Sequence, residues 1–150
     1  MKMKYLFLLL PFLAIKSSAQ SEEDKVKVPI QALFDGMRKS DTTLMRFAFA
    51  PKAILQTISK NKEGGLVVKT EDINNFIAFI GKPHLDVFDE RITFGAIQID
   101  ADLASVWTPY KFFAGEKFSH CGVNSFQLVK LSGEWKIQYI IDTRRKDNCK

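Results

Sequence analysis

The chain has 150 residues, 46% of them hydrophobic, which is enough for one domain and excludes a disordered polar tail. Its formal net charge is +5, but three of the 22 basic residues lie in the first nineteen positions, where there is no acidic residue. Residues 20–150 therefore carry 19 basic and 17 acidic side chains, a net charge of +2. Such a balanced surface lacks the electrostatic footprint of a nucleic-acid-binding protein.

The N-terminus has the pattern of a secretory signal peptide. Lys2 and Lys4 give a positive start, an apolar run follows from Tyr5 to Ile15, and residues 17–19 place small side chains at a cleavage site. As a helix, the apolar run would span about 16 Å, roughly half of the ~30 Å hydrocarbon core of a bilayer, which disfavours a retained anchor. We expect residues 1–19 to be a signal peptide and residues 20–150 to form a single domain. The mature protein would be exported, periplasmic or secreted, with no stable membrane insertion after cleavage.

Both cysteines, Cys121 and Cys149, lie in the part that would be exported. An even number of cysteines in an oxidising compartment favours a disulfide bond, with two free thiols as the alternative. The bond would be structural, because the two residues do not form a C-x-x-C motif. The two histidines, His84 and His120, show no clustered ligand spacing, so the sequence supports neither a metal site nor a cofactor.

Helical periodicity dominates the start of the expected domain. Apolar residues from Val26 to Met37 recur at helical spacing, and Pro29 is compatible with this helix only near its first turn. Asp41 is a suitable N-cap for a second, short helix that Pro51 would stop.

A hairpin and a third helix are expected next. Residues 53–58 and 66–69 are short β-prone runs, separated by a turn sequence that ends in Gly64-Gly65. Residues 70–72 then cap a helix that runs to Ile80 and ends at Gly81.

From Asp86 onward the sequence predicts a β-meander, with strands at about 87–99, 102–113, 118–131 and 135–144. A two-residue turn at Ser132-Gly133 sets Leu131 opposite Glu134. The resulting register pairs Leu128 with Ile137, Phe126 with Tyr139 and Asn124 with Ile141 on the buried face. Helices that precede a curved antiparallel sheet with one covered face indicate an α+β fold.

Several segments also carry a family resemblance. They are Leu33–Asp41 with Phe49-Ala50-Pro51, Trp107–Phe113, Phe118–Val129, and Gly133–Ile137 with Asp142–Arg145. In these segments the chain resembles exported bacterial members of the nuclear transport factor 2-like superfamily, of the kind labelled putative lumazine-binding or SnoaL-like. The resemblance implies a cystatin-like cone, in which N-terminal helices pack on a strongly curved antiparallel sheet and leave a pocket at the open end. Some members use this pocket as an active site and others only for binding, so the fold does not decide the function.

Six residues on the predicted inner face are candidates to line the mouth of the cone as ligand-binding residues: Tyr110, Phe112, His120, Asn124, Phe126 and Tyr139. Each also has a plainer interpretation. The phenylalanines could belong to an ordinary core, and the tyrosines could place a hydroxyl at the rim of the sheet. Asn124 could only satisfy the backbone of a strand edge or bulge. His120 is the one imidazole expected inside, and so the candidate catalytic residue. The predicted register turns Asp142 outward beside Arg144. Three acidic residues near the start of the expected strand 87–99 are interpreted as solvated charges: Asp86, Asp89 and Glu90.

Two functions of different classes follow. The first is a non-catalytic exported domain that binds a small, partly apolar, uncharged or weakly anionic ring-containing molecule. The second is a small lyase, isomerase or hydrolase that uses His120 as acid or base. A non-catalytic dimeric module is a third, because the outer faces of related sheets often pair in homodimers. A buried His120 within hydrogen-bond reach of a carboxylate would favour catalysis, and an aromatic cavity without such a pair would favour binding.

Overall fold

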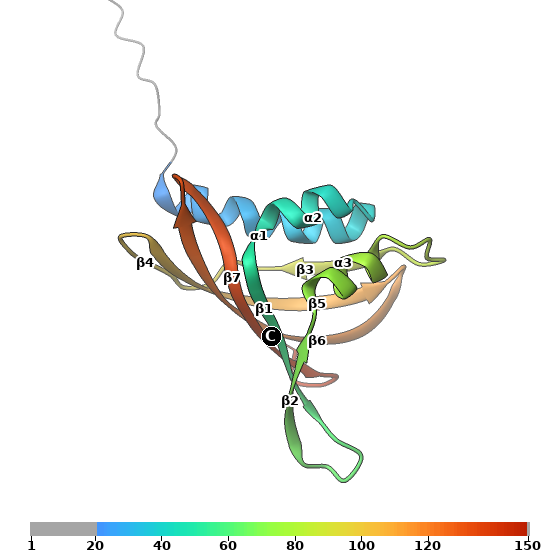
Figure 1. Cartoon of the computed structure of the whole chain (residues 1–150). Coiled ribbons are helices and arrows are strands. Elements are labelled where there is room, and N and C mark those ends of the chain that lie inside the picture. The colour runs from blue at the N-terminus through green and yellow to red at the C-terminus, as the bar shows by residue number, and fades with distance from the viewer. Residues whose placement is uncertain (1–20, 150) are drawn as a thin grey trace, which may run out of the picture.

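A computed structural model describes residues 21–149, so the expected signal peptide lies outside the described residues. In chain order the elements are α1 (Glu22–Lys39), α2 (Thr42–Ala48), β1 (Phe49–Lys60), β2 (Leu66–Glu71), α3 (Ile73–Ile80), β3 (Phe88–Ile92), β4 (Ile97–Asp100), β5 (Leu103–Ala114), β6 (Lys117–Leu131) and β7 (Glu134–Arg145). The strands form one sheet in the order β2-β1-β7-β6-β5-β3, with β4 also paired to β5. All neighbouring strands are antiparallel except β1 and β7, which are parallel. Figure 1 shows the sheet curving around the helices, which confirms the predicted α+β cone.

The helix ends follow from local side-chain chemistry. The Asp41 carboxylate accepts hydrogen bonds from the backbone N–H groups of Thr43 and Leu44, both at 3.0 Å, and so caps α2. The Asp72 carboxylate accepts from the Asn75 N–H at 2.9 Å and caps α3, which ends at Gly81. These caps confirm the predicted starts of the second and third helices.

Pro29 does not lie where the sequence predicts. It sits about two turns inside α1, where its ring nitrogen has no hydrogen to donate to the preceding turn. Its side chain is fully buried, beside Val26 and Ile30 on the face of α1 that packs on the sheet. Burial of this apolar face offsets the missing hydrogen bond, so the expectation that Pro29 lies in the first turn is wrong.

The expected strand 87–99 is two strands, β3 and β4, interrupted at residues 93–96. The Gly95 N–H still donates to the Trp107 carbonyl of β5 at 2.8 Å, and a Cβ atom at Gly95 would lie 2.8 Å from that oxygen. Only glycine fits so close to the neighbouring backbone, and it lies at the interruption between β3 and β4.

The β6–β7 hairpin has the predicted turn and the predicted pairs next to it, Leu131 with Glu134 and Leu128 with Ile137. Beyond them the register shifts, because Gln138 is an extra residue in β7 between Ile137 and Tyr139. Phe126 therefore pairs with Ile140 instead of Tyr139, and Asn124 pairs with Asp142 instead of Ile141. These two predicted pairs are wrong, and the bulge turns Asp142 to the inner face.

The core lies between α1 and the concave face of the sheet. Phe34 of α1 meets Phe126 of β6 edge-to-face, with ring centroids 6.2 Å apart. On the opposite side of the sheet, Cys121 and Cys149 form the predicted disulfide bond with a Cα–Cα distance of 5.8 Å, which holds the C-terminal residues against the sheet. Among residues 21–149, no helix is both long enough and apolar enough to cross a bilayer.

Candidate functional site

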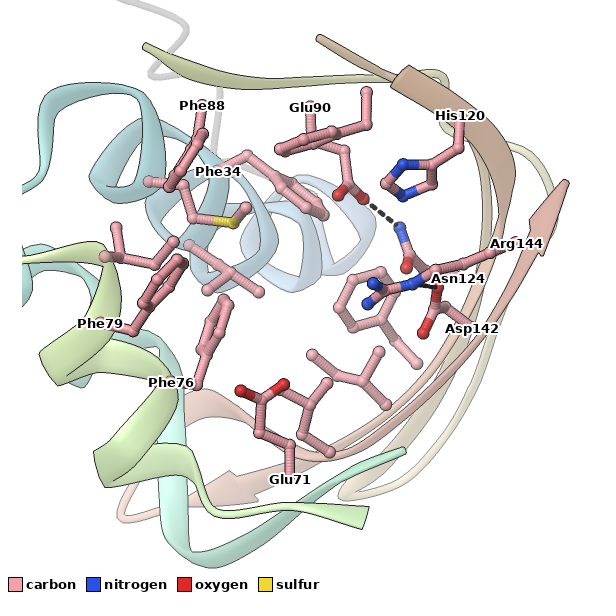
Figure 2. Close-up of a pocket in the computed structure, with 17 residues that line it drawn as sticks. Phe34, Glu71, Phe76, Phe79, Phe88, Glu90, His120, Asn124, Asp142 and Arg144 are labelled. Carbon is pink, nitrogen blue, oxygen red and sulfur yellow. Dashed lines mark hydrogen bonds and ion pairs between the residues drawn. The ribbon is translucent and has the colours of Figure 1, made fainter. Parts of the chain in front are cut away.

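The cone contains a cavity of about 340 Å³ between the helices and the inner face of the sheet. Its walls come from α1, α3 and six strands of the sheet, and exposed side chains such as Phe79 and Glu71 lie at its mouth. Figure 2 shows that the two ends of the cavity differ. Aromatic and aliphatic side chains line the end next to α3, whereas charged and polar side chains gather at the end next to β6 and β7.

The apolar end is an aromatic wall. Phe76 and Phe79 project from α3, and the ring of Phe79 stacks on Phe88 of β3 with centroids 5.9 Å apart. His84 closes this group from outside, since its ring lies 4.4 Å from that of Phe88 and its Nε2 is 2.8 Å from the Phe79 carbonyl oxygen. Phe112 of β5 continues the wall toward the polar end.

Asn124 and Glu90 meet at the polar end. The Asn124 Nδ2 donates to Glu90 Oε1 at 2.8 Å, and Asn124 is buried. Burial raises the pKa of the Glu90 carboxyl to about 7 and the negative charge of Asp142 adds to this rise, against the opposing effects of the Asn124 hydrogen bond and the Arg144 charge. Burial therefore favours the protonated form of Glu90 more than that of an exposed glutamate.

Asp142 anchors the second part of the polar end. It is 5% exposed, and its carboxylate accepts from the Thr57 hydroxyl at 2.5 Å, from the Tyr110 hydroxyl at 3.0 Å and from Arg144 Nε at 3.0 Å. Arg144 also donates from Nη2 to the Thr57 hydroxyl oxygen at 3.1 Å. The guanidinium is thus held in a fixed orientation beside the cavity, as Figure 2 shows.

His120 is half-buried beside this cluster. Its Nδ1 lies 3.0 Å from the Ser119 hydroxyl, and its ring contacts the rings of Phe112 and Tyr110 at centroid distances of 5.0 and 5.7 Å. Burial lowers the pKa of His120, and the positive charge of Arg144 lowers it further. Within residues 21–149, no hydrogen bond joins His120 to a carboxylate.

Four of the six residues predicted to line the pocket do so: Phe112, His120, Asn124 and Phe126. Tyr110 lies behind the cavity wall, with its hydroxyl bonded to Asp142 and to the Thr143 carbonyl oxygen at 3.0 Å each. It packs there because Gly122 has no side chain, and a Cβ at Gly122 would collide with both Thr143 and the Tyr110 ring. Tyr139 is on the outer face, where its hydroxyl donates to Gln56 Oε1 at 2.6 Å, because the bulge at Gln138 reverses its direction.

Sequence reasoning missed the charged residues of the cavity. Glu90, predicted to be a solvated charge, is half-buried against Asn124, and Asp142, predicted to point outward, is at the polar end. Asp89 is also more than a solvated charge, because it bonds Arg38 at 2.8 Å and Arg91 at 2.7 Å. The Asp-x-Arg spacing of residues 142–144 was a visible signal, but only the bulge assigns it to the inner face.

Metal ligands are not clustered in the part of the chain that the structure describes, where no three His, Cys, Asp or Glu side chains are arranged to hold an ion. The charged groups of the cavity instead bond to one another and to hydroxyl or amide groups. This arrangement suits hydrogen bonding to an organic ligand.

Solved structures share this fold at low sequence identity. A nuclear transport factor 2-like protein of unknown function from Shewanella baltica has a TM-score of 0.64 at 18% identity, over 84% of this chain and 95% of that chain. A domain of unknown function with a cystatin-like fold from Nostoc punctiforme has a TM-score of 0.64 at 12% identity, over 87% of this chain and 82% of that chain. A nuclear transport factor 2-like protein with a cystatin-like fold from Novosphingobium aromaticivorans has a TM-score of 0.66 at 8% identity, over 81% of this chain and 80% of that chain. At such identities these likenesses concern the fold alone.

No curated protein matches the chain. The family model described as "Putative lumazine-binding" matches residues 21–139, nearly the whole of the described domain. The cone, its cavity and this match agree with the resemblance seen in the sequence. The chain belongs to the "Putative lumazine-binding" family, and it shares the fold of nuclear transport factor 2-like proteins.

Proposed function

We propose that this protein binds a small, partly apolar, ring-containing molecule in the cavity of the cone. The observation that carries the proposal is the two-ended cavity of about 340 Å³, with an aromatic wall at one end and the Glu90, Asn124 and Arg144 side chains at the other. Ligand pockets of proteins have volumes of roughly 300–1,000 Å³ and combine apolar walls with a few converging polar groups. A ligand with one apolar and one polar end matches both surfaces.

Binding without catalysis is supported by the surroundings of His120. Within the described part of the chain, this imidazole contacts the Ser119 hydroxyl and two aromatic rings, and it has no hydrogen bond to a carboxylate. A histidine acting as acid or base is usually oriented by such a partner. The aromatic cavity without this pair favours ligand binding over chemistry at His120.

Export is part of the proposal. The basic start, the apolar run and the small residues at 17–19 support cleavage before Gln20, and the Cys121–Cys149 bond is compatible with an oxidising compartment. The intact mass of the protein from the cell envelope tests this. A soluble envelope form that retains residues 1–15 would contradict it. Pairing of two copies through the outer face of the sheet stays a prediction.

Native mass spectrometry of the protein purified from its own envelope tests the binding function. We expect a one-to-one non-covalent adduct on the wild-type chain. His120→Ala should weaken it by removing part of the cavity wall, and Leu55→Trp should abolish it by filling the cavity from β1. Gln138→Ala is the matched control, because Gln138 lies outside the cavity lining and should keep the adduct. An adduct that survives Leu55→Trp would place the ligand elsewhere.

Proton transfer in the same cavity is the second candidate, and the position and pKa of Glu90 favour it over His120. The Glu90 carboxylate would take a proton from the carbon next to a ring carbonyl and later return it, while Arg144 donates to the enolate oxygen. Proton NMR of 1-tetralone in D₂O tests this by following exchange at C2. Catalysed exchange that falls at least about 100-fold in Glu90→Gln would support catalysis, and exchange at the buffer rate with the wild type would contradict it.

A further inference from the structure

The hydrogen bonds at the polar end leave particular atoms open toward the cavity. Both Asp142 oxygens are used, Oδ1 by Thr57 and Oδ2 by Tyr110 and Arg144. Glu90 uses Oε1 for Asn124, and Arg144 uses Nε and Nη2. Within residues 21–149, Glu90 Oε2 and Arg144 Nη1 have no hydrogen-bond partner. One acceptor and one charged donor are therefore available to a ligand at the same end.

The charges at this end select against ionic ligands. Glu90 and Asp142 are acidic, Glu71 adds a third carboxylate at the mouth, and Arg144 is the basic residue of the lining. A fully charged anion would face these carboxylates, and a cation would face the guanidinium next to the open Glu90 oxygen. A neutral hydroxyl avoids both costs, because its oxygen accepts from Arg144 and its hydrogen is donated to Glu90.

The size of the cavity and the chemistry of its walls indicate the size and polarity of the remainder of the ligand. An apolar cavity of about 150 Å³ holds benzene, so the 340 Å³ found here has room for two fused rings. Phe76, Phe79 and Phe88 offer flat apolar surface opposite the polar cluster and no hydrogen bonds for a polyhydroxylated molecule. One polar group on a ring system is the best match.

We propose that Glu90 and Arg144 select a fused-ring ligand that carries a single un-ionised, weakly acidic hydroxyl group, which donates to Glu90 and accepts from Arg144. The selection rests on the proposed function, since it acts inside the same cavity. It makes Glu90 the residue that distinguishes a hydroxyl from an ether or a bare ring, because only a hydroxyl can donate to the open carboxyl oxygen.

Calorimetric titration at pH 8, above the pKa of the Glu90 carboxyl, tests this proposal with four matched probes: naphthalene, 2-methoxynaphthalene, 2-naphthol and 2-naphthoate. We expect 2-naphthol to bind the wild type at least about tenfold more tightly than the ether or naphthalene, and 2-naphthoate to bind more weakly than 2-naphthol. In Glu90→Gln the amide oxygen can keep the Asn124 bond, which leaves an NH₂ donor toward the ligand, so the preference for the hydroxyl over the ether should disappear. Glu134→Gln, at the exposed β6–β7 turn, is the control and should keep the preference.

The possible results separate the two proposals. Equal binding of 2-naphthol, its methyl ether and naphthalene would overturn hydroxyl selection while leaving the cavity as a binding site. Tightest binding of 2-naphthoate would overturn it as well, because Arg144 would then recognise an anion. A hydroxyl preference that persists in folded Glu90→Gln would remove Glu90 from the selection. Binding of none of the four probes up to their solubility would overturn both the selection and the proposed function.

Discussion

Asp142 lies directly opposite Asn124 in the β6–β7 ladder, and both side chains face the cavity. This pairing exists because Gln138 bulges out of β7 and moves every later residue of that strand to the other face. Asp142 can then accept from Tyr110 and Thr57, while Asn124 donates to Glu90 on the other side. One extra residue thereby builds the polar end of the cavity.

Asp142 should be important for stability. Replacing it in Asp142→Asn removes the charged acceptor of three donors, and we expect the free energy of unfolding to fall by about 2–3 kcal/mol. Urea unfolding measures this, with the exposed Asp100→Asn as control, for which a change below about 0.5 kcal/mol is expected. If Asp142→Asn lowers the free energy of unfolding no more than Asp100→Asn does, the Asp142 hydrogen bonds contribute nothing to stability.

Glu90 should make the protein less stable as pH rises. Its pKa of about 7 in the folded chain lies above the ordinary value of 4.5, so the folded state holds an extra proton between these pH values. The Glu90 contribution to the free energy of unfolding therefore falls from pH 4.5 to pH 7 and stays constant above. Glu90→Gln cannot titrate, and it should match the wild type at pH 4.5 and exceed it by about 2–3 kcal/mol at pH 8.

Urea unfolding at several pH values measures that difference. His120 titrates in both proteins, so the comparison reports mainly on Glu90. Parallel stability curves for the two proteins from pH 4.5 to 8 would mean that the Glu90 carboxyl has an ordinary pKa.

Replacing Thr108 by an apolar residue of similar shape should stabilise the fold. Its hydroxyl is fully buried on β5, and within residues 21–149 it has no hydrogen-bond partner. Thr108→Val keeps the shape and removes the unsatisfied group, so stability should rise by about 1 kcal/mol. Thr57→Val should do the opposite, because the Thr57 hydroxyl donates to Asp142. Thermal unfolding of both variants compares the two, and a destabilised Thr108→Val would contradict the assignment.

The disulfide bond should stabilise the fold without being required for it. The core is built from α1 and the inner face of the sheet, whereas the bond ties the C-terminal residues to β6 from the other side. The chain-entropy model gives about 3.5 kcal/mol for a loop of this length. The double substitution Cys121→Ala and Cys149→Ala should lower stability by that order while preserving the far-ultraviolet circular dichroism spectrum. An unfolded double variant at 25 °C would show that the core depends on the bond.

Features that depend on neighbouring residues could be predicted from the sequence. The caps at Asp41 and Asp72 need only a carboxylate two or three residues before a free N–H, and the Ser132-Gly133 turn needs only two residues that accept positive φ angles. The disulfide bond followed from the cysteine count. These predictions are confirmed, because none of them depends on the register of the sheet.

The charged end of the cavity could not be predicted in this way. The sequence around Gln138 alternates apolar and polar residues equally well with or without a bulge, because Tyr139 suits either face of a sheet. Glu90 stands between Asp89 and Arg91, a run of charges that is typical of solvent, and its burial arises from packing against Asn124 of β6. Both features depend on contacts between segments far apart in the chain.

The most direct test of ligand binding in the cavity is an NMR titration of the ¹⁵N-labelled protein with 2-naphthol. The side-chain amide of Asn124 and the Nε–H of Arg144 report on the polar end of the cavity, whereas the indole N–H of Trp107, which is 51% exposed, reports on the outer face. We expect the Asn124 and Arg144 signals to shift in a saturable way while the Trp107 signal stays in place. Saturable shifts at Trp107 with unmoved Asn124 and Arg144 signals would contradict the account.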